Sequence, residues 1–187
     1  MRLFVAVEID ERSRAAIAAE QERLRPVAAQ GARIRWVQHD HLHLTLAFLG
    51  DVDRAHADAV IAAMQPPIDR PPFDLIFAGF GMFPPRGAPR ALWVGIREGE
   101  PELRELQQFV AERVTRSGVA LEQRPFSPHL TLGRWKESRP SDRSRLADAL
   151  HERTVARTRI DHATLFESRI SSKGPTYVEL VRATLSG

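Results

Sequence analysis

The tetrapeptide HLTL occurs twice in this chain, at residues 43–46 and at residues 129–132. Nearly half of the 187 residues separate the two copies. Each copy lies in a segment that predicts a β-strand, and a segment that predicts a helix follows it. A motif that recurs in matching surroundings indicates two related halves. We therefore predict a single bilobal domain over residues 1–187, in which each lobe contributes one HLTL strand to a shared cleft.

The pleat of a strand assigns the four letters of the motif to two faces. Side chains at alternate positions point the same way, so His43 and Thr45 share a face, and His129 and Thr131 share the equivalent face. The leucines of both copies point to the opposite face, where they can anchor each lobe in an apolar core. The next position on each polar face holds a small residue, which leaves room for a substrate.

Two histidines that face one another can divide the work of proton transfer. Imidazole titrates near neutral pH, so one ring can accept a proton while the other donates one. Threonine hydroxyls can hydrogen-bond the non-bridging oxygens of a phosphate held between the two rings. The paired motifs therefore predict acid–base chemistry at phosphorus that requires neither a metal nor another cofactor.

A zinc site is the alternative for the first motif. In a strand, His39, His41 and His43 would share one face, and zinc accepts such ligands. However, Asp40 would point to the opposite face, and no carboxylate at a matching spacing completes the site. The second copy also has no counterpart of the first two histidines. We therefore interpret His43 as the functional residue, and His39 and His41 as residues at the entry to the strand.

Composition excludes several other kinds of site. The chain contains no cysteine, which rules out disulfides, thiolate nucleophiles and cysteine-based metal centres. The start of the chain turns acidic too early for a signal peptide, and no apolar run approaches the ~18 residues of a membrane span. We expect a cytoplasmic monomer without a membrane partner. The net charge of +3 rests almost wholly on arginine, which suits phosphate contacts and permits a nucleic-acid partner without requiring one.

The remaining segments predict an α+β fold. Several expected strands follow one another directly, which favours mixed or antiparallel sheets over a doubly wound parallel sheet. No linker or low-complexity segment divides the chain. The expected helices cover residues 10–31, 51–64, 101–118 and 141–153, and the expected strands cover 2–9, 33–37, 43–50, 73–83, 90–96, 129–135, 163–170 and 176–185.

Paired His-x-Thr motifs in a chain of this length resemble the 2H phosphoesterase superfamily. The particular resemblance is to the RNA 2′,3′-cyclic phosphodiesterases, also described as RNA 2′-5′ ligases. It extends over nearly the whole chain and includes the segments RLFVAVEI, FGMFPPRGAPRALWVGI, FSPHLTLGR and LFESRISSKGPTYVEL. The resemblance implies a bilobal, pseudo-symmetric fold in which two sheets flank a central cleft and helices lie outside.

The same resemblance implies a role for each residue of the motifs. His43 resembles the proton donor for the leaving ribose oxygen, and His129 resembles the base that activates water. Thr45 and Thr131 resemble the hydroxyls that hold the phosphate. The implied reaction is hydrolysis of a 2′,3′-cyclic phosphodiester end of RNA to a 2′-phosphomonoester.

Two further positions match the family by place, five residues after each histidine. Phe48 resembles an aromatic residue on which the terminal base stacks, and Arg134 resembles a basic residue near the phosphate. An ideal pleat would send both side chains to the leucine face, so a bulge near Ala47 and Gly133 is needed to turn them back. The alternatives are core packing for the phenylalanine and a salt bridge at the rim for the arginine.

Other functions remain open from the sequence. The same site could act on a small cyclic or 2′-5′-linked nucleotide, or it could catalyse RNA 2′-5′ ligation. A non-catalytic module that binds RNA ends would keep the arginines but would not need both histidines. The expected partner is therefore an RNA with a 2′,3′-cyclic phosphate terminus or a small nucleotide. Trp93 is expected in the core, and Tyr177 is expected to pack beside the last hairpin.

Overall fold

The structure is a computed structural model that describes residues 1–28, 33–122, 124–171 and 174–187. Its helices are α1 (Glu11–Ala28), η1 (a 3₁₀ turn, His39–His41), α2 (Arg54–Met64), α3 (Glu100–Arg116) and α4 (Pro140–Ala147). Its strands are β1 (Arg2–Glu8), β2 (Arg33–Trp36), β3 (His43–Asp51), β4 (Phe73–Phe83), β5 (Ala91–Glu98), β6 (Leu130–Glu137), β7 (Thr154–Ile160), β8 (His162–Ser171) and β9 (Gly174–Thr184).

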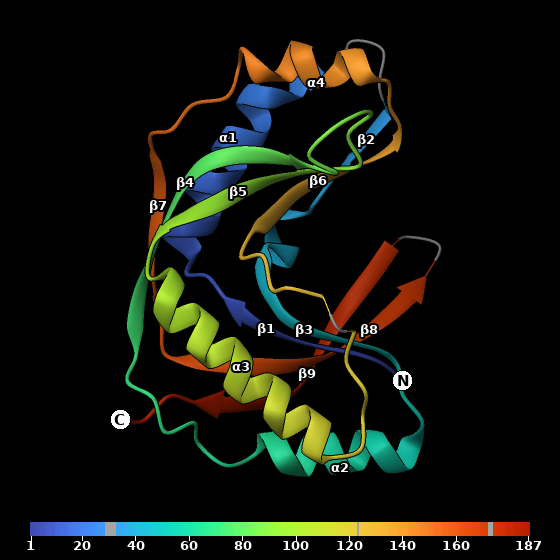
Figure 1. Cartoon of the computed structure of the whole chain (residues 1–187), viewed down its shortest axis with the longest axis vertical. Coiled ribbons are helices and arrows are strands. Elements are labelled where there is room, and N and C mark those ends of the chain that lie inside the picture. The colour runs from blue at the N-terminus through green and yellow to red at the C-terminus, as the bar shows by residue number, and fades with distance from the viewer. Residues whose placement is uncertain (29–32, 123, 172–173) are drawn as a thin grey trace.

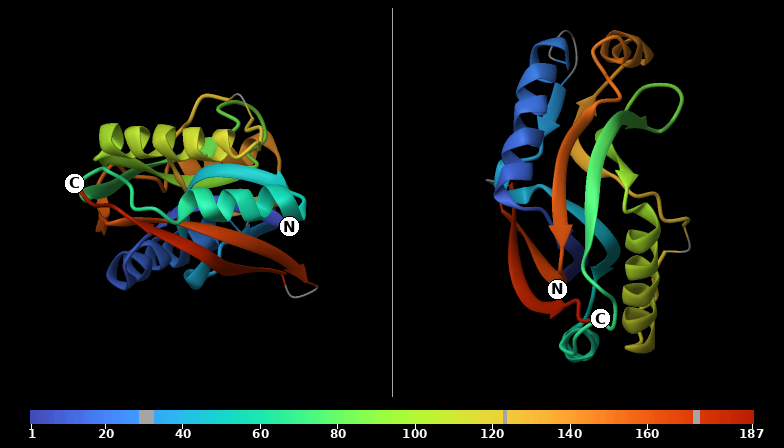
Figure 2. Two further views of the ribbon diagram at one scale, coloured as in Figure 1. Left: turned by 90° about the horizontal axis from the view of Figure 1, so that it is seen from below. Right: turned by 90° about the vertical axis from the view of Figure 1, so that its left-hand side faces the viewer.

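Two sheets carry the two HLTL motifs separately. A four-stranded sheet has the order β3-β1-β8-β9, and a five-stranded sheet has the order β2-β6-β5-β4-β7. The named strands pair antiparallel in both sheets. Helices α1 and α4 lie at the end of the molecule that holds the five-stranded sheet, whereas α2 and α3 lie at the other end (Figures 1 and 2). The predicted α+β fold with antiparallel sheets is confirmed.

The strand orders of the two sheets are related. When each sheet is read from its HLTL strand, the order β3-β1-β8-β9 of the smaller sheet corresponds to the order β6-β5-β4-β7 of the larger one. The larger sheet has one further strand, β2, at the edge beside β6. The helix that follows the second strand of each order crosses to the opposite sheet: α1 packs on β7, and α3 packs on β3 (Figure 1). The two sheets therefore exchange helices, which a motif repeat alone does not predict.

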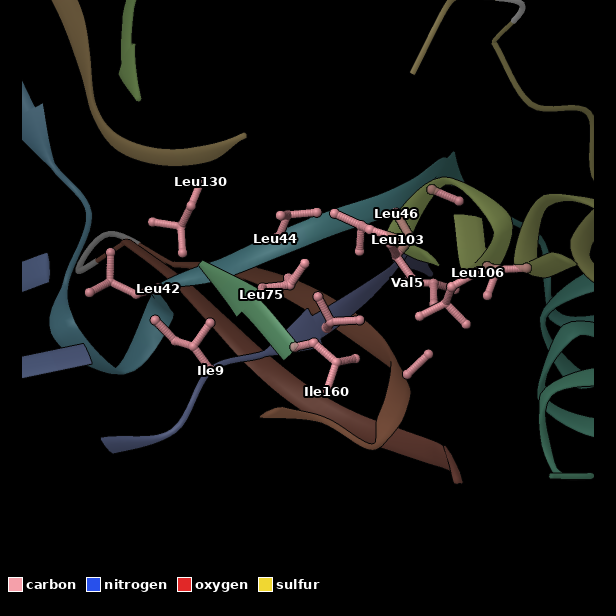
Figure 3. Packing of buried hydrophobic residues seen from close by; sticks show 14 of the residues in the cluster. Val5, Ile9, Leu42, Leu44, Leu46, Leu75, Leu103, Leu106, Leu130 and Ile160 are labelled. Carbon is pink, nitrogen blue, oxygen red and sulfur yellow. The ribbon is translucent and has the colours of Figure 1, made fainter. Parts of the chain in front are cut away.

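The leucines of both motifs belong to one buried cluster. Leu44 and Leu130 have no exposed surface, and Leu46 and Leu132 are also buried. Figure 3 shows the first three of these side chains among other buried apolar residues of β1, β3, β4 and α3. The expected separation of leucine and histidine faces is confirmed, because the histidines and threonines of both motifs keep partial exposure.

Two local predictions were wrong. The segment Thr154–Ile160 forms β7, with buried residues alternating with exposed arginines, although no strand was expected there. The fourth helix ends at Ala147, six residues before the expected end. His39–His41 form a 3₁₀ turn that precedes β3, so they do not share a strand face with His43 as the zinc alternative required. The expected end of the first helix at Gly31 lies outside the described residues, as does part of the turn that joins the last two strands.

None of the described helices combines the length and apolar character that a membrane span requires.

Glu8 ties three strands of the smaller sheet together. Its Oε2 atom accepts hydrogen bonds from His162 Nε2 at 3.1 Å and from Thr164 Oγ1 at 3.0 Å, both on β8. Arg182 of β9 donates to the same oxygen at 3.3 Å. The hydrogen bond from His162 is the largest of the effects that lower the pKa of Glu8 to about 2.

Glu8→Gln is expected to lower the free energy of unfolding by about 1–3 kcal/mol at pH 6, in line with the size of this pKa change. A depressed carboxyl pKa stabilises the fold above the ordinary value of 4.5, and this stabilisation is lost as the pH falls toward about 2. The difference between variant and wild type in urea unfolding should therefore shrink over that range. Glu137→Gln, an exposed control paired with Arg33, should change stability by less than about 0.5 kcal/mol. Equal losses in both variants would contradict this account.

Candidate active site

One cavity of about 570 Å³ contains residues from both motifs. β3 supplies its residues from the edge of the smaller sheet, and β6 supplies the facing residues from the larger sheet. The HLTL strands thus meet at a single cavity although they belong to different sheets. Every site residue expected from the sequence lines this cavity: His43, Thr45, Phe48, His129, Thr131 and Arg134.

The two histidines are held in the same way. His43 Nδ1 lies 2.7 Å from the carbonyl oxygen of His41, and His129 Nδ1 lies 2.7 Å from that of Ser127. A carbonyl oxygen can only accept, so Nδ1 carries the hydrogen in both rings and donates it to the residue two positions earlier. Each neutral ring therefore keeps its lone pair on Nε2. In the first motif, Thr45 Oγ1 lies 3.2 Å from His43 Nε2 and donates to it.

Aromatic side chains fix both imidazoles. His43 stacks on Phe4 with ring centroids 5.0 Å apart, and the edge of Tyr177 meets it at 5.4 Å. His129 meets Phe83 edge-on at 4.9 Å. Removal from water disfavours the charged form of each ring. Burial accordingly lowers the pKa of His43 to about 4 and also lowers the pKa of His129.

A bulge in β3 turns Phe48 toward the cavity. β1 pairs Val5 with Ala47 but Ala6 with Thr45, so Leu46 has no partner in this register. The extra residue reverses the alternation, and Phe48 becomes 47% exposed on the same face as Thr45. The core-packing alternative for Phe48 is therefore wrong.

The same bulge recurs in β6. β5 pairs Leu92 with Gly133 but Trp93 with Thr131, so the intervening Leu132 is unpaired there. Arg134 consequently returns to the face of Thr131 and lines the cavity. Within the described residues it forms no ion pair with a carboxylate, which removes the rim salt bridge as an explanation for this side chain.

The neighbouring histidines do not form the zinc site considered above. His39 Nε2 lies 3.3 Å from Glu11 Oε1, and its Nδ1 lies 3.1 Å from Asp40 Oδ1, outside the cavity. His41 lines the cavity and contacts Tyr177, with ring centroids 4.6 Å apart, which its assignment as a strand-entry residue missed. Across the part of the chain that the structure describes, no three His, Asp or Glu side chains gather as metal ligands would.

Sequence reasoning also missed several aromatic and basic residues of the site. Tyr177 packs, as expected, but against His41 and His43 inside the cavity. Trp93 is only half-buried and lies 6.1 Å from the His129 ring, so its expected place in the core was wrong. Arg2 lies over the Phe48 ring at 5.2 Å. The alternation of RIRW on β2 was the one available signal for Arg35, which also lines the cavity.

Comparison with known proteins assigns the class. The chain belongs to the 2′-5′ RNA ligase superfamily, whose sequence profile matches residues 13–169, and the resemblance to 2H phosphoesterases is thereby confirmed. Curated relatives include the RNA 2′,3′-cyclic phosphodiesterase of Archaeoglobus fulgidus, 32% identical over 186 residues, which cover 96% of this chain and 98% of the relative. The enzyme of the same name from Aquifex aeolicus is 34% identical over 82% of each chain.

Solved structures agree with this assignment. The crystal structure of E. coli LigT complexed with 3′-AMP superimposes with a TM-score of 0.77 at 27% identity, over 100% of this chain and 98% of LigT. LigT complexed with ATP gives a TM-score of 0.73 at 27% identity and the same coverage. The predicted enzyme class, a phosphoric diester hydrolase, agrees with the names of the curated relatives.

Proposed function

We propose that this protein hydrolyses 2′,3′-cyclic phosphodiester ends of RNA to 2′-phosphomonoesters by two-histidine acid–base catalysis. The observation that carries the proposal is the pair of imidazoles, one from each sheet, that line one cavity and are held identically at Nδ1. That arrangement leaves two Nε2 atoms for proton transfer. Hydroxyls and guanidinium groups complete the cavity, as an anionic phosphodiester requires.

In the proposed reaction, water attacks the phosphorus atom in line with the departing 3′-oxygen. His129 Nε2 takes a proton from the water as the new P–O bond forms. The P–O3′ bond breaks, and His43 Nε2–H donates its proton to the 3′-oxygen. The ring protons then exchange with solvent, which restores the starting state.

The hydroxyls, Arg134 and Phe48 position the substrate in this proposal. Thr45 and Thr131 donate hydrogen bonds to the non-bridging oxygens, and Arg134 balances the negative charge. Protonation of His43 ends its acceptor role, so it releases the Thr45 hydroxyl toward the phosphate. Phe48, which lines the cavity and is exposed, offers a face on which the terminal base stacks.

In this proposal, His43 becomes protonated, and therefore able to act as the acid, only when the substrate binds. In the free protein the pKa of His43 is about 4, so its ring is neutral near pH 7. A bound phosphodiester anion favours the imidazolium and raises this pKa. Binding and protonation of His43 are therefore coupled, and the acid forms where the leaving oxygen lies.

The pH dependence follows from these directions. The profile of kcat/KM reports the free protein, so both limbs should lie below the ordinary histidine value of 6.5. The profile of kcat reports the complex, and its alkaline limb should lie at least about one pH unit higher. Steady-state rates from pH 4 to 9 measure both profiles. Flat profiles, or alkaline limbs at the same pH, would contradict the coupling.

The proposal is tested with an RNA oligonucleotide that carries a 2′,3′-cyclic phosphate. We expect a 2′-phosphomonoester as product, with the same rate in EDTA. Parallel assays with 2′-5′-linked oligoadenylate and a small cyclic nucleotide phosphate test the small-substrate alternative. This alternative is supported by the solved structures of LigT complexed with the small nucleotides 3′-AMP and ATP. Turnover of only those compounds would overturn RNA as substrate. Binding without turnover would indicate a non-catalytic RNA-end module, and joining of a 5′-hydroxyl RNA would reveal the reverse ligation.

A further inference from the structure

Two arginines lie opposite each other where β2 meets β6. Arg35 pairs with Arg134 in the antiparallel register, and both exposed side chains line the large cavity. Like charges in directly opposite positions destabilise a pair of strands. Neither guanidinium forms an ion pair with a carboxylate of the described residues. The pair therefore offers two positive charges to an anion that the described chain does not supply.

A second cavity continues the first one beyond this pair. Its volume is about 170 Å³, and most of its lining residues also line the large cavity, among them Arg35, Arg134, His41 and Tyr177. None of the four histidines and threonines of the two motifs lines it. Of the residues of β3 and the turn before it, only His41 reaches the smaller cavity. Along the chain, His43 and Thr45 lie between His41, which lines both cavities, and Phe48, which lines only the large one.

Gly174 fixes the position of Arg35 at this end. A Cβ atom on Gly174 would lie 2.5 Å from a terminal nitrogen of Arg35, so the guanidinium sits directly against the backbone of β9. The φ of 121° at Gly174 also favours glycine. Arg35 thus extends from the larger sheet to the backbone of the smaller one and places a positive charge at both cavities.

Both arginines act on Tyr177, and each of them also acts on one histidine. Burial lowers the pKa of His129, and the charge of Arg134 lowers it further. Burial also lowers the pKa of His41, and Arg35 is among the charges that add to this effect. Arg134 is therefore close to a reacting histidine, whereas Arg35 is close to His41, which lines both cavities.

We propose that Arg35 and the smaller cavity bind a second backbone phosphate of RNA, next to the phosphate that reacts. This inference rests on the proposed function of the large cavity and narrows its substrate class to RNA ends of at least two nucleotides. The second phosphate has two sources: the strand upstream of the cyclic end, or the 5′-hydroxyl strand that enters during ligation. In both cases the ligand is a phosphodiester anion held by a guanidinium.

The test compares a dinucleotide and a mononucleotide that each end in a 2′,3′-cyclic phosphate. For the wild type, kcat/KM of the dinucleotide should fall more steeply with salt, by about 0.7 in the log–log slope for one additional phosphate contact. Arg35→Met should lower kcat/KM of the dinucleotide about tenfold and that of the mononucleotide less than about twofold. The additional salt dependence should disappear in this variant.

Arg33→Met is the matched control, because Arg33 lies on the same strand, pairs with Glu137 and lines neither cavity. It should leave both substrates within about twofold of the wild type. A loss in Arg35→Met that is confined to ligation supports the entering strand as the source. Equal losses for both hydrolytic substrates, or no loss in either reaction, would overturn the inference.

Equilibrium binding separates this inference from the proposed function. The 2′-phosphorylated dinucleotide should bind about tenfold more weakly to Arg35→Met than to the wild type, and the 2′-phosphorylated mononucleotide should bind equally well to both. Failure of the wild type to hydrolyse either cyclic substrate would refute the proposed function, and the binding comparison would still decide the role of Arg35. Equal binding of the dinucleotide to both proteins would then count against it.

Discussion

Replacing His43 or His129 by alanine is expected to lower kcat on a cyclic RNA end by about 10³-fold, within the range that general acid–base catalysis contributes. Each variant loses one of the two Nε2 atoms that the cavity offers for proton transfer. KM should change much less, because the threonines and Arg134 still hold the phosphate. Single-turnover rates with saturating protein measure the chemical step directly.

His39→Ala is the control for these variants. His39 begins the 3₁₀ turn that precedes β3, and it does not line the cavity. Its ring pairs with the carboxylates of Glu11 and Asp40. Its loss should change kcat by less than about threefold. The double variant of His43 and His129 should be little slower than the slower single variant, because groups that act as a unit are not additive. Turnover that survives either single substitution would contradict the acid–base account.

Replacing Leu44 or Leu130 by alanine is expected to lower the free energy of unfolding by about 3 kcal/mol, as the removal of a fully buried leucine side chain typically does. Both side chains have no exposed surface and belong to the cluster shown in Figure 3. Each is adjacent to a histidine of the proposed acid–base pair, yet neither lines the cavity. The folded variants should therefore keep most of their activity at low temperature. Urea unfolding and kcat, measured on the same samples, check both expectations.

Ile170→Ala is the matched control for stability, since Ile170 lines the cavity and is 71% exposed. Its loss should change the free energy of unfolding by less than about 0.5 kcal/mol. The expected contrast separates the two faces of the HLTL strands: leucines determine stability, and histidines with threonines determine turnover. A leucine variant with wild-type stability would show that the strands are oriented differently.

The period-2 pattern of HLTL was sufficient to predict much of the site. It placed His43 and His129 on cavity faces and the leucines on core faces, because a strand permits only two directions for its side chains. The near-repeat also indicated two related sheets. These features depend on short-range geometry, which a sequence expresses directly.

Features that depend on one extra residue or on distant packing were harder to predict. Phe48 and Arg134 required a bulge, and the sequence does not state whether Leu46 or a neighbour loses its partner. The shared pattern of two consecutive buried residues before an exposed one became visible only with the register. Tyr177 lies on β9, which pairs with β8 in the last hairpin, and it reaches the site because β8 pairs with the distant strand β1.

The exchange of helices between the sheets and the strand β7 belong to the same group. Helices α1 and α3 each pack on the sheet opposite to the strand they follow, and no local pattern encodes that choice. The segment of β7 does alternate, with buried Ala156, Thr158 and Ile160 separated by exposed Arg157 and Arg159, and this period is typical of a strand.

The central claim is that one imidazole from each sheet meets the same phosphate. Ring ¹⁵N NMR during titration with a nucleoside 2′-phosphate tests it most directly, with His43→Gln and His129→Gln used to assign the signals. Both rings should respond at Nε2 with one common dissociation constant, and His43 should gain a proton on binding. A response of only one ring, or two responses with separate dissociation constants, would contradict the claim.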